Sequence, residues 1–248
     1  MPFRLLVANW KMQLDVRESA DLARSFRQKW RGFSGAPEVV LCPSHVALAA
    51  VHDALGRSSI GLGAQDAFWE AAGSYTGEVS PLTLAELGCR YVIVGHSERR
   101  ALLGETDVMV AAKAASVSHA GLTPIICVGE RQKRGWKRTE EFLRKQLQAA
   151  LSKRPQRFVV AYEPVWAIGT GIPARPEDVR VVYKILREEL VRSCHPGVGR
   201  RVPLLYGGSV DANNAKEFIQ DPENGGLLVG RAGQALRSLL DLVKIGIG

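Results

Sequence analysis

The stretch Phe158-Val159-Val160-Ala161-Tyr162-Glu163-Pro164 is a short, apolar, β-branched run that ends on a charged residue and a proline. Such a run is typical of a buried strand of a parallel sheet, and a segment of helical periodicity follows it. The same alternation recurs along the chain, in the runs Arg4–Trp10, Glu38–Pro43, Ile60–Asp66, Tyr91–His96, Thr123–Gly129, Phe158–Pro164, Val202–Gly208 and Gly226–Arg231. Eight strand–helix units predict an α/β fold, a closed (β/α)8 barrel in which residues 1–248 form one domain.

The segments between these runs have apolar stripes at helical spacing. The stripe after the first strand comprises Val16, Ala20, Ala23, Phe26 and Trp30. The stripe before the seventh strand follows Pro176, a residue suited to a helix start, and comprises Val179, Val182, Leu186 and Leu190. We expect both stripes to face the barrel.

The chain is basic, with 33 Lys and Arg against 25 Asp and Glu and a formal net charge of +8. This balance favours anionic partners such as phosphorylated metabolites, nucleic acid or acidic membranes. The densest basic run, Arg131–Arg138, contains Trp136 and allows a nucleic-acid patch as one interpretation. A solvated loop leading into a helix is the interpretation we favour, so no nucleic-acid partner is expected.

The four cysteines, Cys42, Cys89, Cys127 and Cys194, have no metal-ligand spacing, and no metal site is expected. Cysteines in apolar runs behave as small hydrophobic residues, which favours a reducing, cytoplasmic environment. The sequence also shows no signal-type segment at Met1–Arg4 and no apolar span long enough for a membrane. Neither export nor membrane insertion is expected.

Active sites of such barrels lie at the C-terminal ends of the strands, which directs attention to polar residues that end the apolar runs. These are Asn9, Lys11, His96, Glu163, Gly207-Gly208-Ser209 and Gly230. Glu163 is a candidate general base, held extended by Pro164. His96 precedes an expected helix start at Ser97-Glu98, which disfavours an imidazolium but leaves a neutral hydrogen-bond donor. Each residue alone also fits a structural role, such as a surface ion pair.

Three further features belong to the same end of the barrel. Lys11 is a cation well placed to meet a substrate anion. The glycine turns after strands seven and eight, the first of them before an expected helix at Asp211–Gln220, can cradle a phosphate with backbone N–H groups. The segment Ile168-Gly169-Thr170-Gly171 is suited to a lid that excludes water.

The connection Ala67–Ser80 is longer than an ordinary strand-to-helix loop and is rich in Ala, Gly, Ser and Tyr. A protruding tip around Tyr75-Thr76-Gly77 could dock into a second copy of the barrel, which predicts a homodimer through residues 67–80. A merely flexible loop is the alternative.

Four stretches resemble the triosephosphate isomerase family, in order and across nearly the whole chain. They are Ala8-Asn9-Trp10-Lys11-Met12, Gly95-His96-Ser97-Glu98-Arg99-Arg100, Ala161–Gly171 and Tyr206-Gly207-Gly208-Ser209-Val210. The resemblance implies a TIM barrel and a cofactor-free aldose–ketose isomerase of glycolysis and gluconeogenesis. Such an enzyme interconverts glyceraldehyde 3-phosphate and dihydroxyacetone phosphate through an enediolate; the handling of its acid and base groups is a standard illustration of pKa tuning.

The resemblance also implies roles for individual residues. Glu163 would carry the proton between C1 and C2, neutral His96 would act on the two substrate oxygens, and Lys11 with Asn9 would stabilise the enediolate. Gly169, Ser209 and Gly230 would hold the phosphate. The supporting residues would be Glu98 and Arg99 beside the site, Trp166 in the lid, Tyr206 with Ser209 as its latch, and Thr76 reaching into a neighbouring subunit.

Two departures from the family pattern concern the phosphate pocket and the lid. The sequence has Arg231 where the family usually has a second glycine, and Ile172-Pro173 where it usually has a Lys-containing continuation. A backbone N–H at Arg231 can still serve the phosphate if its φ is negative, whereas a left-handed conformation would be strained. Two other functions therefore stay open: an isomerase of a longer sugar phosphate such as erythrulose phosphate, and a non-catalytic anion-binding barrel.

Overall fold

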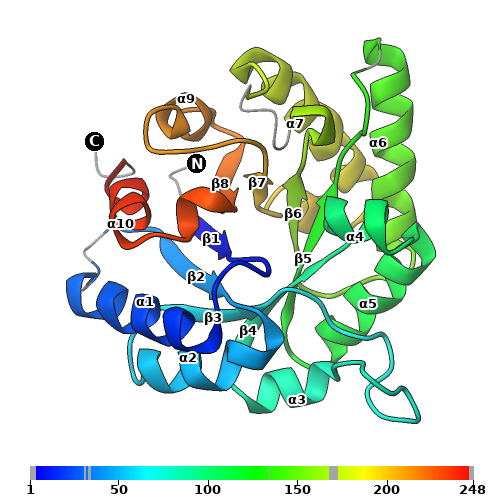
Figure 1. Ribbon diagram of the computed structural model, residues 1–248. Helices are drawn as coiled ribbons and strands as arrows, with labels where there is room; N and C mark the ends of the chain where they lie inside the picture. The colour runs from blue at the N-terminus through cyan, green and yellow to red at the C-terminus, as the bar shows by residue number, and fades with distance from the viewer. Residues whose placement is uncertain (1–3, 31, 33–34, 134, 168–172, 246–248) are drawn as a thin grey trace.

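The computed structural model describes residues 4–30, 32, 35–133, 135–167 and 173–245. Its centre is a closed barrel of eight parallel strands that pair in chain order, with β8 returning to β1 (Figure 1). The strands are β1 (Leu5–Asn9), β2 (Glu38–Cys42), β3 (Gly61–Ala64), β4 (Cys89–Val94), β5 (Thr123–Val128), β6 (Val159–Tyr162), β7 (Leu204–Tyr206) and β8 (Asn224–Val229). The predicted (β/α)8 fold is confirmed.

Helices surround the barrel (Figure 1). The α-helices are α1 (Val16–Lys29), α2 (Leu48–Leu55), α3 (Pro81–Glu86), α4 (Ser97–Leu102), α5 (Asp107–His119), α6 (Trp136–Leu151), α7 (Pro176–Ser193), α8 (Pro196–Gly199), α9 (Ala215–Ile219) and α10 (Leu236–Ile245). Short 3₁₀ turns are η1 (His45–Ala47), η2 (Val165–Ala167) and η3 (Arg231–Gly233). The last two follow β6 and β8 and border the catalytic end of the barrel.

The alternation of side chains along each strand gives the protein two apolar layers. Val7, Ile93, Ile125 and Leu205 belong to a small cluster that fills the barrel interior. The alternate residues of the same strands, such as Val92 and Ile126, belong to a larger cluster between the barrel and its helices. Because both faces of each strand are buried, the strands are apolar without a polar face, as parallel barrels require.

The helix stripes are confirmed in one case and wrong at one end in the other. Pro176 opens α7, and its predicted apolar face, Val179, Val182, Leu186 and Leu190, is buried. In α1, Ala23 and Phe26 are buried, but Val16 is 43% exposed. Val16 is the first residue of α1, directly after the Asp15 N-cap, where the helix begins beyond the cover of the barrel.

All eight predicted strands extend one or two residues too far toward the C-terminus. Strand β4 ends at Val94 because Gly95 takes φ +72, a left-handed conformation that turns the chain toward α4. Strand β8 ends at Val229, and Gly230 leaves the extended conformation with ψ −100. The helix expected at Asp211–Gln220 is also shorter, since α9 covers Ala215–Ile219 and an Asp211-centred turn precedes it.

The cysteines lie mostly in the strands, and no helix among the described residues is long and apolar enough to cross a membrane. All four cysteines are free thiols, and three of them are buried within strands. No group of His, Cys, Asp and Glu within the described part of the chain is arranged to hold a metal ion.

Candidate active site

The polar residues predicted from the strand ends meet in one cavity at the C-terminal end of the barrel. This cavity has a volume of about 1020 Å³ and receives residues from the ends of β1, β4, β6, β7 and β8. Its lining includes Asn9, Lys11, His96, Glu98, Glu163, Ser209, Gly230 and Arg231. Segments that are far apart in the sequence thus bring a carboxylate, an imidazole, an ammonium and several backbone N–H groups to one space.

Glu163 follows β6 and is buried, with 2% of its surface exposed. Its backbone N–H donates to the carbonyl of Val128 over 2.8 Å, which fixes the residue at the barrel rim. Each carboxylate oxygen has a donor: Oε1 lies 3.0 Å from Nε2 of His96, and Oε2 accepts from the N–H of Ser97 over 2.8 Å. These two donors hold the carboxylate in the site, and no Lys or Arg among the described residues pairs with it.

His96 is the N-cap of α4 and is also buried. Its Nδ1 accepts a hydrogen bond from the backbone N–H of Glu98 over 3.3 Å, so Nδ1 carries no proton. The single proton then lies on Nε2, which donates to Glu163. The predicted neutral imidazole is therefore the tautomer that this hydrogen bonding selects.

Lys11 has a left-handed backbone, with φ 53, which is uncommon for a residue with a long side chain. Two neighbours hold this conformation: Oδ1 of Asn9 accepts from the Lys11 N–H over 3.0 Å, and Nε2 of Gln65 donates to the Lys11 carbonyl over 2.8 Å. The ammonium pairs with Oε1 of Glu98 at 2.5 Å, with the side chain 27% exposed. The pocket cation is thus paired and aimed at the cavity.

The glycine turns form the side of the cavity opposite α4. Gly230 lies against the Lys11 side chain: a Cβ at this glycine would be 3.4 Å from Cε of Lys11. Arg231 begins η3 and is absent from the residues with positive φ, so the strained alternative does not apply. Its exposed side chain also lines the cavity. The two turns and Arg231 therefore provide N–H groups and one guanidinium at this side.

The segment expected to be the lid, Ile168–Gly171, lies outside the described residues, and so does Ile172. The expected phosphate-binding residue Gly169 is part of this segment. The two flanks of the segment are held by specific contacts. On one flank, Nε1 of Trp166 donates to Oε1 of Glu130 over 2.7 Å, and Oγ of Ser209 donates to the carbonyl of Ala167 over 3.0 Å. On the other, the N–H of Ala174 donates to the Tyr206 hydroxyl over 3.3 Å.

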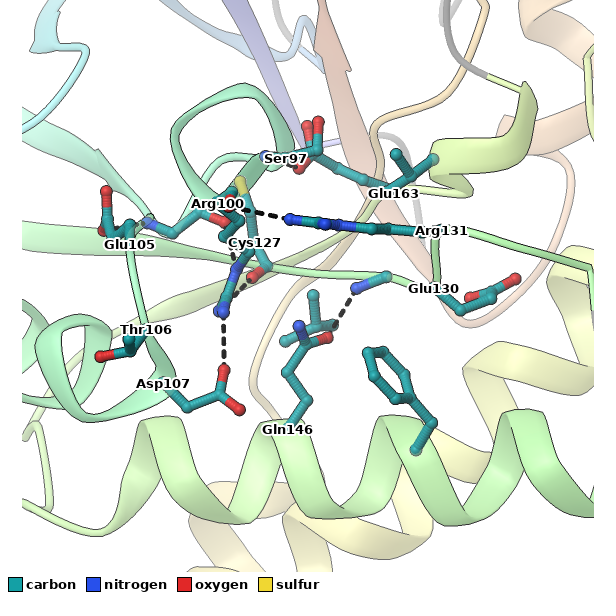
Figure 2. A pocket seen from close by; sticks show the side chains of 15 residues that line it. Ser97, Arg100, Glu105, Thr106, Asp107, Cys127, Glu130, Arg131, Gln146 and Glu163 are labelled. Atoms are coloured by element: carbon teal, nitrogen blue, oxygen red, sulfur yellow. Dashed lines mark hydrogen bonds and ion pairs between the residues drawn. The ribbon is translucent and has the colours of Figure 1, made fainter. Parts of the chain in front are cut away.

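Behind Glu163, on the α6 side of the barrel rim, lies a second cavity of about 400 Å³ (Figure 2). The thiol of Cys127 lies beside Glu163, and burial together with the charge of Glu163 raises the pKa of this thiol well above its ordinary value. Gln146 rises from α6 and accepts from the Gly129 N–H over 2.8 Å. Gly129 allows close approach, because a side chain there would overlap the Glu163 carbonyl. These contacts fix the position of Glu163 from the rear.

Glu130 also borders this rear cavity and is buried. Its Oε1 accepts from the Tyr162 hydroxyl over 3.0 Å and from Trp166, while its Oε2 has no partner within the described part of the chain. Burial raises the pKa of Glu130, and the hydrogen bonds from Trp166 and Tyr162 oppose this shift. Sequence reasoning missed this residue because it lies one position beyond the end of an apolar run and shares no motif.

A buried charge network supports the site from β3, α4 and α5. Lys113, 1% exposed, donates to both carboxylate oxygens of Asp66 at 2.9 and 2.8 Å. Glu105 accepts from the N–H of Gly95 over 3.1 Å and pairs with Arg99 at 2.6 Å. The network thereby fixes the residue that precedes His96. Arg99 was expected to support the site, but the sequence offered no signal for Lys113 or Glu105.

The loop of residues 67–80 projects from the barrel beside α3 (Figure 1). It is stiffened from within: Phe68 packs on Trp69 and Tyr75, with ring centroids 4.0 and 4.6 Å apart, and the Phe68 N–H donates to the Val79 carbonyl over 2.8 Å. Thr76 is exposed at the tip. A loop that is ordered by its own side chains differs from the flexible alternative.

The geometry agrees with comparisons to known proteins. A family model described as triosephosphate isomerase matches residues 4–246. The chain belongs to the triosephosphate isomerase family. Similar relatives, each named triosephosphate isomerase, come from Dictyoglomus turgidum (39% identity over 97% of this chain and 98% of the relative), Nitrosococcus oceani (42% over 97% of each) and Halorhodospira halophila (42% over 92% of each).

Membership of the triosephosphate isomerase family explains why the cavity combines a buried carboxylate with a neutral imidazole. An isomerase of this kind moves a proton between two neighbouring carbons and needs a base and an electrophile, but no redox group. The strand ends of this barrel bring together a carboxylate and an imidazole, groups of the kind that can fill these two roles. The family match also confirms the resemblance that the four sequence stretches indicate.

Proposed function

We propose that this barrel interconverts dihydroxyacetone phosphate and glyceraldehyde 3-phosphate, with Glu163 as the base, His96 as the hydrogen-bond donor and Lys11 as the cation. The observation that carries the proposal is the 3.0 Å contact between Glu163 and Nε2 of a neutral His96, in a cavity that Lys11 also lines. The reaction belongs to glycolysis and gluconeogenesis and uses no cofactor.

The proton transfers follow from this arrangement. Glu163 removes a proton from C1 of the ketose, the electron pair forms the C1–C2 double bond, and the carbonyl oxygen becomes an enediolate oxygen. Nε2–H of His96 donates to that oxygen, and the ammonium of Lys11, with Asn9 nearby, stabilises the negative charge. A proton then passes from the C1 hydroxyl to the C2 oxygen by way of Nε2 of His96. Glu163 returns its proton to C2 while the electron pair on the C1 oxygen forms the aldehyde carbonyl, so two protons change places and none is gained or lost.

Both carboxylate oxygens of Glu163 accept hydrogen bonds from the protein. At least one donor must be released before the carboxylate can reach a C–H group. A substrate carbonyl near Nε2 of His96 would take over its hydrogen bond and free Oε1. Substrate binding and activation of the base are therefore linked through one imidazole.

The phosphate group would bind at the glycine turns. Gly230, the N–H groups of Gly208 and Ser209, and Gly169 are the proposed partners, and Arg231 adds a guanidinium that can form a charge-assisted bond. The lid would close over this end, with Trp166 at one flank and Tyr206 and Ser209 as its latch. Closure excludes water and retains an enediolate that would otherwise lose phosphate.

A homodimer and a cytoplasmic location are part of the proposal. The stiff, exposed tip at Thr76 is suited to insertion into a second barrel, and Met12 and Val46, 92% and 81% exposed, lie at the same end of the barrel. Exposed apolar side chains mark an interface where they gather into one patch, and we assign these two to such a patch in the proposed dimer. No nucleic acid or membrane takes part in the proposed reaction.

The test is isomerisation of glyceraldehyde 3-phosphate by purified protein in a coupled assay, alongside Glu163→Gln. We expect fast turnover that is lost in the variant, which removes the base but keeps the hydrogen bonds of a neutral side chain. Erythrulose phosphate is the comparison substrate, because Arg231 alters the pocket. Faster turnover of erythrulose phosphate would contradict the triose assignment, and activity on neither substrate would contradict the enzyme itself.

A further inference from the structure

A third cavity, of about 310 Å³, lies at the end of the barrel opposite to Glu163. Two segments line it: one follows α6 and contains Arg154, Gln156 and Phe158, and the other follows α7 and contains His195 and Val198. Phe158 directly precedes β6 and lies five residues before Glu163, about 16 Å away at the usual rise of a strand. The cavity shares no lining residue with the catalytic cavity.

The two segments around this cavity hold most of the net charge of the protein. Residues 151–158 and 192–203 contain no Asp or Glu and include six cations: Lys153, Arg154, Arg157, Arg192, Arg200 and Arg201. Arg192 lies 3.4 Å from Glu189. The other five cations form no ion pair with any residue in the described ranges. Some exposed cations elsewhere, such as Arg24 and Arg180, have carboxylate partners, whereas others, such as Arg138, form no ion pair with the described residues.

The ends of the neighbouring helices do not balance this charge. Helix α6 ends at Leu151 and α7 ends at Ser193, so their C-terminal carbonyls face this end of the barrel. A helix C-terminus is equivalent to about −0.5 elementary charge, so the two ends together offset about one of the five unpaired cations. An excess of about four positive charges remains on the two segments, and Arg154, which lines the cavity, is one of them. This charge favours a multiply charged anion.

The cavity itself combines an apolar floor with a few polar groups. Leu151, Pro155 and Phe158 are buried and form its apolar part. The side-chain amide of Gln156 forms no hydrogen bond within the described ranges. Nδ1 of His195 accepts from the Gly197 N–H over 3.3 Å, which leaves Nε2 as a donor. Apolar walls with a few polar groups are typical of sites for small organic ligands, although this volume is near the lower end of their range of about 300–1,000 Å³.

We propose that this cavity binds a nucleoside monophosphate. The planar base would pack on the apolar floor, the Gln156 amide would meet its polar edge, and the dianionic phosphate would lie at the rim beside Arg154. A guanidinium group can form two parallel hydrogen bonds to phosphate oxygens. The negative charge of the phosphate would pair with cations that have no carboxylate partner. The site does not depend on the isomerase function proposed above.

The experiment is a calorimetric titration of the whole protein with adenosine monophosphate, alongside adenosine and inorganic phosphate. The variant is Arg154→Asn, because Arg154 has φ 52 and asparagine tolerates this left-handed conformation. The matched control is Arg138→Gln, which removes an exposed cation without an ion pair among the described residues from the first turn of α6. Loss of a charge-assisted hydrogen bond should weaken binding about tenfold or more in Arg154→Asn.

We expect adenosine monophosphate to bind more tightly than adenosine or phosphate, the control to bind as the parent protein does, and isomerase turnover to stay unchanged in both variants. Equal affinity in Arg154→Asn, equal affinity for inorganic phosphate, or the absence of saturable binding would overturn the proposal. Competition between the nucleotide and the triose substrate would place binding in the catalytic cavity instead. Binding of an oligonucleotide without binding of the monophosphate would also count against it.

Discussion

The carboxylate of Glu163 has a partner for each of its oxygens, and both partners are neutral donors. A cation in their place would hold the carboxylate more firmly and lower its basicity. Hydrogen bonds from an imidazole and one backbone N–H can be exchanged for hydrogen bonds to substrate at little cost. The activity of Glu163 as a base should therefore depend mainly on where its carboxylate is placed.

Shortening this side chain tests that argument. In Glu163→Asp the carboxylate retracts by about one bond length, and a displacement of ~1 Å can cost about 10²-fold in rate. We expect a loss of this size in kcat and an unchanged melting temperature. Steady-state kinetics and thermal unfolding provide the two measurements. A loss of less than a few-fold would remove Glu163 from the role of base.

Arg231 is the residue of the pocket that departs from the family pattern. If its guanidinium adds a charge-assisted bond to the substrate phosphate, Arg231→Gly should raise KM several-fold and weaken the dependence of KM on salt. Titrating sodium chloride into the isomerase assay measures both effects. Unchanged KM and salt dependence would show that the side chain points to solvent.

Glu130 gives a prediction about pH. Its pKa is raised in the folded protein, so folding is most favoured while the carboxyl is protonated in both states. Stability is then lost as pH rises from the unfolded pKa, near 4.3, through the higher folded pKa. Glu130→Gln has no charge to bury. As pH rises across this interval, the free energy of unfolding of the parent protein should therefore fall relative to that of the variant. Urea denaturation at several pH values measures the difference, and parallel pH profiles would contradict it.

The sequence predicted the residues that end strands, and for a physical reason. Asn9, His96 and Glu163 follow apolar runs, and in a parallel barrel all such ends meet at one rim. Cys127 on β5 contacts Glu163 from behind, and Glu130 binds the nearby Tyr162 and Trp166. These contacts depend on which strands are neighbours. The spacing of residues in the sequence therefore could not predict which residues lie behind Glu163.

At the level of helices and strands, buried charges hold α5 to the barrel. Asp66 follows β3, Glu105 precedes α5, and Lys113 on α5 reaches both, at 2.8 and 3.4 Å. Arg99 of α4 pairs with the same two carboxylates. Removing one cation from such a network leaves buried carboxylates without their partner, which costs far more than an exposed pair.

Lys113→Met should therefore lower the free energy of unfolding by about 3–5 kcal/mol. The matched control is Lys145→Met, an exposed position on α6, for which we expect a change within about 0.5 kcal/mol. Urea denaturation of both variants measures the difference. Similar values for the two would show that the pair with Asp66 contributes little net stability.

The elements themselves were largely predictable, but their ends were not. The apolar face of α7 follows from periodicity alone. The prediction that Val16 faces the barrel was wrong because a helix can begin before it reaches the barrel. Strand β4 is shorter than predicted because Gly95 takes a left-handed conformation. Both errors come from tertiary position, which acts at the ends of elements more strongly than in their middles.

For the whole molecule, closure of the barrel followed from counting eight strand–helix units. The order of the strands follows from the short connections between them. The oligomeric state is harder to predict than the fold, because the sequence of one chain does not show directly which of its surfaces contacts a second copy. The ordered loop of residues 67–80 and the exposed apolar residues at the same end of the barrel are the features on which the proposed dimer rests.

A charge at the loop tip tests the assembly. Thr76→Arg should convert the proposed dimer to a monomer, because a buried unpaired guanidinium is costly at an interface. Turnover should fall with it if the tip completes the neighbouring site. Sedimentation gives the mass, and Gln28→Arg, on the exposed face of α1, is the control. A dimer that persists in Thr76→Arg would place the interface elsewhere or refute it.

The four residues of β6 also limit how the chain can change in length. Side chains alternate between the interior and the helix side, so one residue inserted into β6 would exchange the two sets and displace Glu163 from its hydrogen bonds. The loop of residues 152–157, before the same strand, carries no such alternation. Insertions and deletions among homologous chains should therefore accumulate in that loop and be absent from β6. Comparing the lengths of these two segments among homologous chains is enough to see this pattern.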